Sequence, residues 1–170
     1  DGVEVRHKYL WNNSGYVLPS KYKGYDVWQG PGNVGVWARF LPCLEYQGVD
    51  YYAVFDDDTI PGHRFLKVAC DLLDGVGGNH LVAATGVVFL SGWRDEREYV
   101  GPNNDSTRDL VCVVDVPGHA WVFSREVLLE WAAMYKHTVP HYSTCGEDYM
   151  LARAVQKLGG WCIVPKYPLN

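Results

Sequence analysis

The spacing of apolar residues predicts four helices along the chain. Apolar side chains recur at intervals of three and four, as one face of a helix requires, in residues 34–46, 65–73, 125–136 and 147–158. The first of these segments begins at a glycine-rich turn, whose backbone amides can meet an anion. The last segment is followed by Gly159 and Gly160, a sequence that ends helices.

Runs of β-branched and aromatic residues predict the strands, at residues 3–11, 25–28, 50–55, 80–90, 109–116, 120–123 and 161–164. Residues 50–55 are almost continuously apolar, as in a strand covered by helices on both faces. Residues 80–90 form either one buried strand or two segments bent at Gly86. Residues 93–108 are polar, charged and marked by glycine and proline, which predicts a loop.

Helices alternate with strands early in the chain, and the order becomes more mixed late, which favours an α/β fold. We expect a mixed, mostly parallel central sheet flanked by helices. A length of 170 residues with 48% apolar residues suits one compact domain over residues 1–170. The chain opens at Asp1 without a signal peptide, so we expect it to be a piece of a longer protein. Further domains of that protein are then candidate partners.

Charge and cysteine content narrow the partners and the location. The net charge of −5 supplies no basic stripe for a nucleic acid, and no apolar run is long enough to span a membrane. The five cysteines are widely spaced without a CxxC pair, which favours reduced thiols and a cytoplasmic location. Glycosylation tripeptides at 12–14 and 104–106 point the other way and leave the Golgi lumen open.

Three consecutive carboxylates follow the apolar strand 50–55. Asp56, Asp57 and Asp58 repel one another and need solvent, a cation or hydrogen-bond donors. Ligands of open α/β sheets bind beyond the carboxyl ends of strands, and hard divalent cations take carboxylate ligands there. Asp56 and Asp58 can face one such cation, while Asp57 points elsewhere. A solvated turn is the alternative, because aspartate and proline are common in turns.

The order of motifs resembles that of GT-A type glycosyltransferases. It runs through VFDDDTIPGHRF, TGVVFL, VDVPGHAWVFSRE and CGEDYMLARAVQKLGG, covering roughly residues 11–164. Within this group the chain is similar to the branch found in large algal viruses and in family-2-like enzymes of bacteria and algae. The resemblance implies a Rossmann-like nucleotide-binding half, with an Asp-x-Asp metal motif after a central strand and a Glu-Asp pair opening a later helix.

The resemblance assigns roles to the acidic residues. Asp58 would ligate Mn²⁺ or Mg²⁺, and Asp56 would ligate the metal or the ribose. Asp57 would meet a ribose hydroxyl or a backbone amide. Asp148 matches the catalytic base of inverting members, and Glu147 beside it would bind the acceptor. Acidic residues in the first turn of a helix are also stabilised by the helix dipole, so a purely structural role for this pair stays open.

The resemblance also assigns residues to the nucleotide. Asn12 and Asn13 would recognise the base, although a turn explains them equally well. Asn33 and Arg39 match a segment that lines the nucleotide pocket, where the arginine would pair with the diphosphate. A surface arginine is the commoner case.

Two histidines and a tryptophan complete the candidates that the resemblance points to. His119 and His141 are candidates for a third metal ligand, although a lone histidine is usually structural. Trp121 is expected in the core, or as a platform for a sugar ring.

The implied activity is transfer of a sugar from a nucleoside-diphosphate sugar, with UDP as the expected nucleotide, to a hydroxyl of a glycan or glycoconjugate. Inversion is expected and retention stays open. The first strand of the family is not recognisable here, so the chain is expected to lack it. Two alternatives remain: a GT-A-like domain that binds nucleotide sugars or glycans without turnover, and a metal-dependent phosphoesterase.

Overall fold

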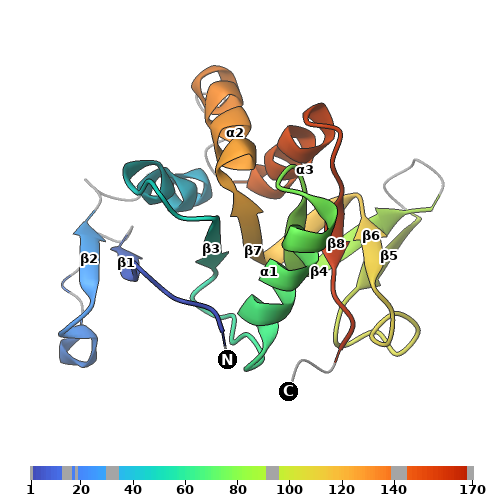
Figure 1. Ribbon diagram of the computed structural model, residues 1–170, viewed down its shortest axis with the longest axis horizontal. Coiled ribbons are helices and arrows are strands. Elements are labelled where there is room, and N and C mark those ends of the chain that lie inside the picture. Colours follow the sequence, from blue (N-terminus) through green and yellow to red (C-terminus); the bar gives the residue numbers. More distant parts are fainter. Residues whose placement is uncertain are drawn as a thin grey trace.

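The computed structural model describes residues 2–12, 17, 19–29, 35–90, 96–138 and 145–167 (Figure 1). Its main sheet has six strands, with β3, β7, β4, β8 and β6 in that order and β5 paired to β4. Their bounds are Tyr51–Phe55 (β3), Leu81–Phe89 (β4), Arg97–Val100 (β5), Cys112–Val114 (β6), Val116–Ser124 (β7) and Cys162–Val164 (β8). The expected α/β class is confirmed.

The expectation of a mostly parallel sheet is wrong. Strand β7 runs antiparallel to both of its neighbours, β3 and β4, and the β4–β5 and β6–β8 pairs are antiparallel too. Among the described residues of this sheet, β4 and β8 make the parallel pair. A parallel pair needs a long crossover connection, whereas the paired strands β4 and β5 follow one another through a few residues.

Several strands differ in extent from the sequence prediction, and the one predicted at residues 3–11 covers only Tyr9–Asn12. The predicted strand 109–116 ends at Val114, and Val116 opens a long strand that includes the predicted 120–123. The predicted loop 93–108 contains β5. In β4 the irregularity lies between Ala83 and Thr85 rather than at Gly86.

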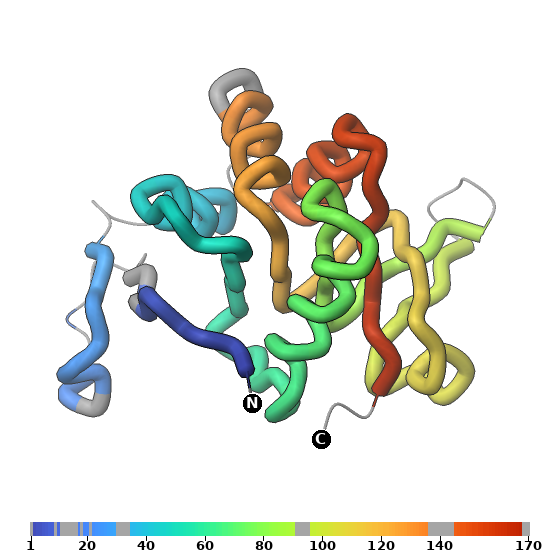
Figure 2. Tube along the Cα trace, viewed as in Figure 1, coloured from blue at the N-terminus to red at the C-terminus, as the bar shows by residue number. Residues whose placement is uncertain are grey.

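Helices cover both faces of the sheet (Figures 1 and 2). Helix α1 (Phe65–Val76) packs on one face against Val82, Ala120 and Val122. Helices α2 (Arg125–Thr138) and α3 (Glu147–Lys157) and the helix η2 (Val36–Glu45) lie on the other face. Alternate residues of one strand serve the two cores, because successive side chains of a strand point to opposite faces; Val122 faces α1, and Trp121 and Phe123 face the opposite side.

Helix η2 is where residues 34–46 were predicted to be helical, but it is a 3-10 helix. It contains Pro42, which has no backbone N–H to donate. Its buried side chains, Trp37 and Phe40 among them, join the core under β7. The helix therefore buries its apolar face in the core. Arg39, which lies between the buried residues Ala38 and Phe40, reaches Asp56 at the end of β3.

The N-terminal segment forms a separate two-stranded sheet. Strands β1 (Tyr9–Asn12) and β2 (Asp26–Gln29) pair in parallel, and a short 3-10 helix, Ser20–Tyr22, lies between them in the sequence. Figure 2 shows this pair at the margin of the molecule, beyond β3. None of the helices in the described residues is both long enough and apolar enough to cross a membrane.

Gly160 provides a test of the packing between α3 and the loop before β4. A Cβ at residue 160 would lie 1.9 Å from the backbone oxygen of Asn79. We expect Gly160→Ala to lower the free energy of unfolding by about 3 kcal/mol, because backbone must move to accept the methyl group. In contrast, Gly75→Ala at the exposed end of α1 meets nothing within 4 Å and should raise stability by up to about 1 kcal/mol. Urea unfolding of both variants checks this, and equal effects would contradict it.

Candidate active site

The carboxylate triplet lies at the carboxyl end of β3, next to the middle of β7. Phe55 pairs with Ala120, and the backbone N–H of Asp56 donates to the carbonyl oxygen of His119 at 3.2 Å. Asp57 and Asp58 then form a turn, closed by the N–H of Thr59 donating to the carbonyl oxygen of Asp56 at 3.1 Å. The antiparallel register thus places residue 119 beside residue 56.

His119 has a backbone conformation that is rare outside glycine. Its φ is 66°, and it is the residue other than glycine with positive φ in the described part of the chain. Such strain persists where the surrounding structure imposes it and is concentrated at functional sites. Gly118 beside it has no room for a side chain, because a Cβ there would lie 2.9 Å from the Oγ1 of Thr85. The register between β4 and β7 also shifts here: Ala83 pairs with Trp121 and Thr85 with Gly118, so β7 has one extra residue in the stretch that contains His119.

Asp56, Asp58 and His119 form a candidate metal centre. One ligand atom from each lies within 4.8 Å of the others. Asp58 and His119 are exposed and Asp56 is half-buried, so the group opens to solvent. Carboxylates suit Mg²⁺ and Mn²⁺, and an imidazole nitrogen favours Mn²⁺ over Mg²⁺, which takes oxygen ligands. The donor set fits a divalent cation, with Asp57 outside the group and His141 outside the described residues.

Arg39 connects this group to the start of α3. Its Nη1 pairs with Oδ1 of Asp56, and its Nη2 lies 3.5 Å from Oε1 of Glu147. Its Nε donates to the carbonyl oxygen of Val36 at 2.8 Å, and its guanidinium lies over the ring of Trp121 at 5.4 Å. Pairing of this arginine with a diphosphate stays a prediction. Trp121, buried to 1% exposure, is a core residue, as expected.

Helix α3 presents the Glu147–Asp148 pair at its first turn. The helix is preceded by Gly146, whose φ of 91° is the left-handed conformation that favours glycine. The indole of Trp37 donates to the carbonyl oxygen of Cys145 at 3.0 Å, and this fixes the approach of the chain. Glu147 is buried at 9% exposure, which an unpaired carboxylate would not tolerate, and Arg39 supplies its partner.

Asp148 is the candidate whose proton affinity is most altered. The pKa of Asp148 is raised from 3.8 to about 7, mainly because the carboxyl group is buried and secondly because of the nearby charge of Glu147, while the charge of Arg39 acts in the opposite direction. Its buried Oδ1 has no hydrogen-bond partner among the described residues. A carboxyl group with a pKa near neutrality can both take and give a proton at physiological pH, which is the property required of a general acid or base.

Of the asparagines predicted to bind the nucleotide, the structure describes one. Asn12 ends β1, paired with Gln29 of β2, away from the main sheet. Asn13 and Asn33 lie outside the described residues. The structure therefore brings together Arg39, Asp56, Asp58, His119 and the Glu147–Asp148 pair.

The ion pairs that Arg39 makes with both Asp56 and Glu147 were not predicted from the sequence. Nothing local to the sequence signals them, because the two carboxylate partners of Arg39 lie 17 and 108 residues away along the chain.

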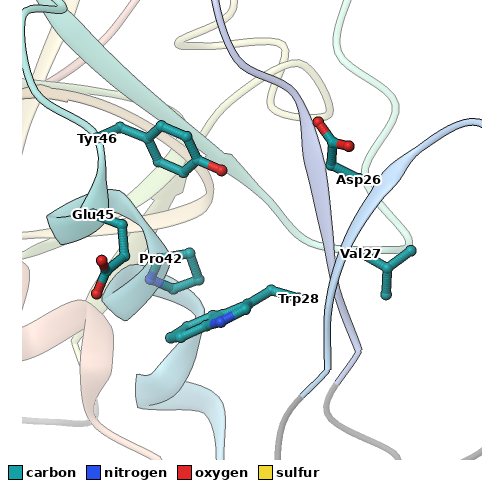
Figure 3. A pocket seen from close by; sticks show the side chains of 6 residues that line it. All are labelled: Asp26, Val27, Trp28, Pro42, Glu45 and Tyr46. Atoms are coloured by element: carbon teal, nitrogen blue, oxygen red, sulfur yellow. The ribbon is translucent and has the colours of Figure 1, made fainter.

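Apart from the candidate active site, a hollow lies between β2 and η2, with a volume of about 160 Å³. Figure 3 shows the side chains that line it, two carboxylates, two aromatic rings and two aliphatic residues: Asp26, Val27, Trp28, Pro42, Glu45 and Tyr46. None of the candidate residues of the metal group or of α3 belongs to this lining. The hollow is therefore separate from the candidate active site.

Comparison with known proteins adds no relative: no family model matches this chain, and no curated protein matches it.

The raised pKa of Asp148 makes stability depend on pH. Between about pH 4 and pH 7 the folded protein keeps a proton on Asp148 that the unfolded chain releases, so stability falls as pH rises through this range. Since one pKa unit corresponds to about 1.4 kcal/mol, the loss approaches about 4 kcal/mol at full effect. We expect Asp148→Asn to abolish most of this decline, measured by urea unfolding at several pH values. A decline unchanged in the variant would show that Asp148 titrates normally.

Proposed function

We propose that this protein is a metal-dependent glycosyltransferase, which moves a sugar from a nucleoside-diphosphate sugar to a hydroxyl of a glycan or glycoconjugate with inversion. The observation that carries the proposal is the joining of two sites by one arginine. A candidate cation group of Asp56, Asp58 and His119 lies on one side of Arg39, and a carboxyl pair with a near-neutral member lies on the other. The motif order that resembles GT-A enzymes supports it.

The metal group accounts for the leaving group. Asp56, Asp58 and His119 would hold Mn²⁺ or Mg²⁺, and a bound cation of this kind neutralises charge that develops on a departing diphosphate. Asp57, exposed in the turn, is left to meet a ribose hydroxyl. Asn12 and Asn13 would recognise the base, and Asn33 would line the nucleotide pocket; UDP is the proposed nucleotide.

The carboxyl pair accounts for the acceptor. The acceptor oxygen attacks the anomeric carbon, the bond from that carbon to the phosphate oxygen breaks, and the diphosphate keeps the electron pair. Asp148, in its ionised form, takes the proton of the acceptor hydroxyl. Burial raises its proton affinity and so makes it a better base than a solvated aspartate. Glu147, held by Arg39, would border the acceptor.

The donor site can be tested by calorimetry with nucleoside diphosphates and their sugars, with and without Mn²⁺. We expect Mn²⁺-dependent binding of UDP or a UDP-sugar, reduced at least tenfold in Asp58→Ala because one carboxylate ligand is lost. Asp71→Asn is the matched control, since that exposed carboxylate pairs with Lys67 on α1. Binding that needs no metal, or that survives in Asp58→Ala, would contradict the metal assignment.

The base can be tested by turnover with the donor identified in that way. We expect Asp148→Asn to lower kcat by about 10²- to 10⁴-fold while donor binding persists, because a general base contributes about this much. Anomeric analysis of the product by NMR should show inversion. Full activity of the variant, or retention in the product, would remove Asp148 from this role. Tight donor binding with neither turnover on any acceptor nor hydrolysis of the donor by water would favour a binding domain instead.

A further inference from the structure

The two oxygens of Asp56 face different partners. Oδ1 pairs with Nη1 of Arg39, whereas Oδ2 lies 3.8 Å from Nδ1 of His119, on the side of the metal group. Arg39 therefore occupies one oxygen of the carboxylate and leaves the other directed at the place where a cation would bind. A partner that orients a ligand in this way usually affects metal affinity strongly.

Arg39 is itself held in place. Its Nε donates to the Val36 carbonyl oxygen, and its guanidinium lies over the buried ring of Trp121. Its side chain is 20% exposed, and the carboxylates of Asp56 and Glu147 are 22% and 12% exposed. Charges that are this little exposed are screened less by salt than surface charges are. The guanidinium fork also lets one side chain serve two carboxylates, which a lysine ammonium does less well.

We infer that Arg39 is a positioning residue that couples cation binding at Asp56 to the charge of Glu147 at the start of α3. The inference rests on the metal site of the proposed function and adds a link between its two halves. A cation on Oδ2 neutralises part of the negative charge of Asp56 and so weakens the ion pair between Asp56 and Arg39. Arg39 then pairs more strongly with Glu147.

The coupling must act in both directions. If a cation at Asp56 strengthens the pair between Arg39 and Glu147, then the charge of Glu147 strengthens cation binding by the same factor. Removing that charge leaves Arg39 to Asp56 alone, where it competes with the cation for the carboxylate. Without Arg39, Glu147 has no such route to the metal group.

The test is a double-mutant cycle on Mn²⁺ affinity, measured by calorimetry with the metal alone. We expect Glu147→Gln to weaken Mn²⁺ binding by about threefold to tenfold in the wild-type background. In the Arg39→Met background the same substitution should change affinity by less than about twofold. Arg39→Lys, which keeps the charge but not the fork, should give an intermediate coupling.

Controls separate the coupling from general effects of charge. Glu130→Gln removes a carboxylate from an ion pair with Lys157 outside the site and should leave Mn²⁺ affinity unchanged in both backgrounds. An equal effect of Glu147→Gln with and without Arg39, or no effect in the wild-type background, overturns the inference while the proposed function stands. If Arg39→Met does not fold, Arg39→Gln takes its place in the cycle.

A second readout needs no metal. Asp56→Asn and Glu147→Gln, singly and together, are compared by urea unfolding in the metal-free protein. Non-additive effects in the wild-type background that become additive in Arg39→Met support the coupling, and additivity in both backgrounds overturns it. If the wild-type protein binds no Mn²⁺, the proposed function and the coupling to cation binding both fail, whatever this cycle shows.

Discussion

The antiparallel pairing of β3 with β7 is the constraint on which the site depends. Because Phe55 lies opposite Ala120, the residue after β3 meets the residue before Ala120, and the N–H of Asp56 bonds to the carbonyl oxygen of His119. A shift of one residue would turn every side chain of β3 to the other face of the sheet. The buried pairing thus holds a carboxylate and an imidazole together across 63 residues of chain, and the cost of the positive φ at His119 is borne by that packing.

Electrostatics organise the other side of the same site. Asp56 and Glu147 share the guanidinium of Arg39, and Asp148 is close enough for its pKa to respond to both Glu147 and Arg39. Arg39 forms ion pairs with Asp56 and Glu147, whereas the pKa of Asp148 is raised chiefly by desolvation. A carboxyl group that is buried without a paired cation keeps its proton to higher pH. The same arrangement therefore keeps the charged carboxylates of the candidate metal group and a carboxyl group of raised pKa side by side.

The helices matter to the site through their ends and their anchors. Trp37 and Phe40 of η2 are buried in the core under β7, so the helix is fixed although Pro42 interrupts its hydrogen bonding. Trp37 also bonds the carbonyl oxygen of Cys145, just before α3 begins. One aromatic side chain thereby fixes both the helix that carries Arg39 and the turn that presents the Glu147–Asp148 pair.

Local pattern was enough to predict most elements and the chemical types in the site. The apolar run 50–55 became β3, and the helical spacing at 65–73 and 147–158 became α1 and α3. The carboxylate triplet follows β3 directly, as the sequence indicated, and its role as a cation site stays a prediction. These features depend on side chains that are close in sequence, so periodicity and turn residues reveal them.

Pairing and burial came only from the tertiary structure. The direction of β7, the hairpin of β4 with β5, the nearness of His119 to Asp56 and the bridge of Arg39 each join residues far apart in the chain. The pKa of Asp148 depends on how deeply a helix end is buried. Local sequence patterns predict neither the pairing of distant residues nor the depth of burial, because both arise from contacts between segments that fold onto one another.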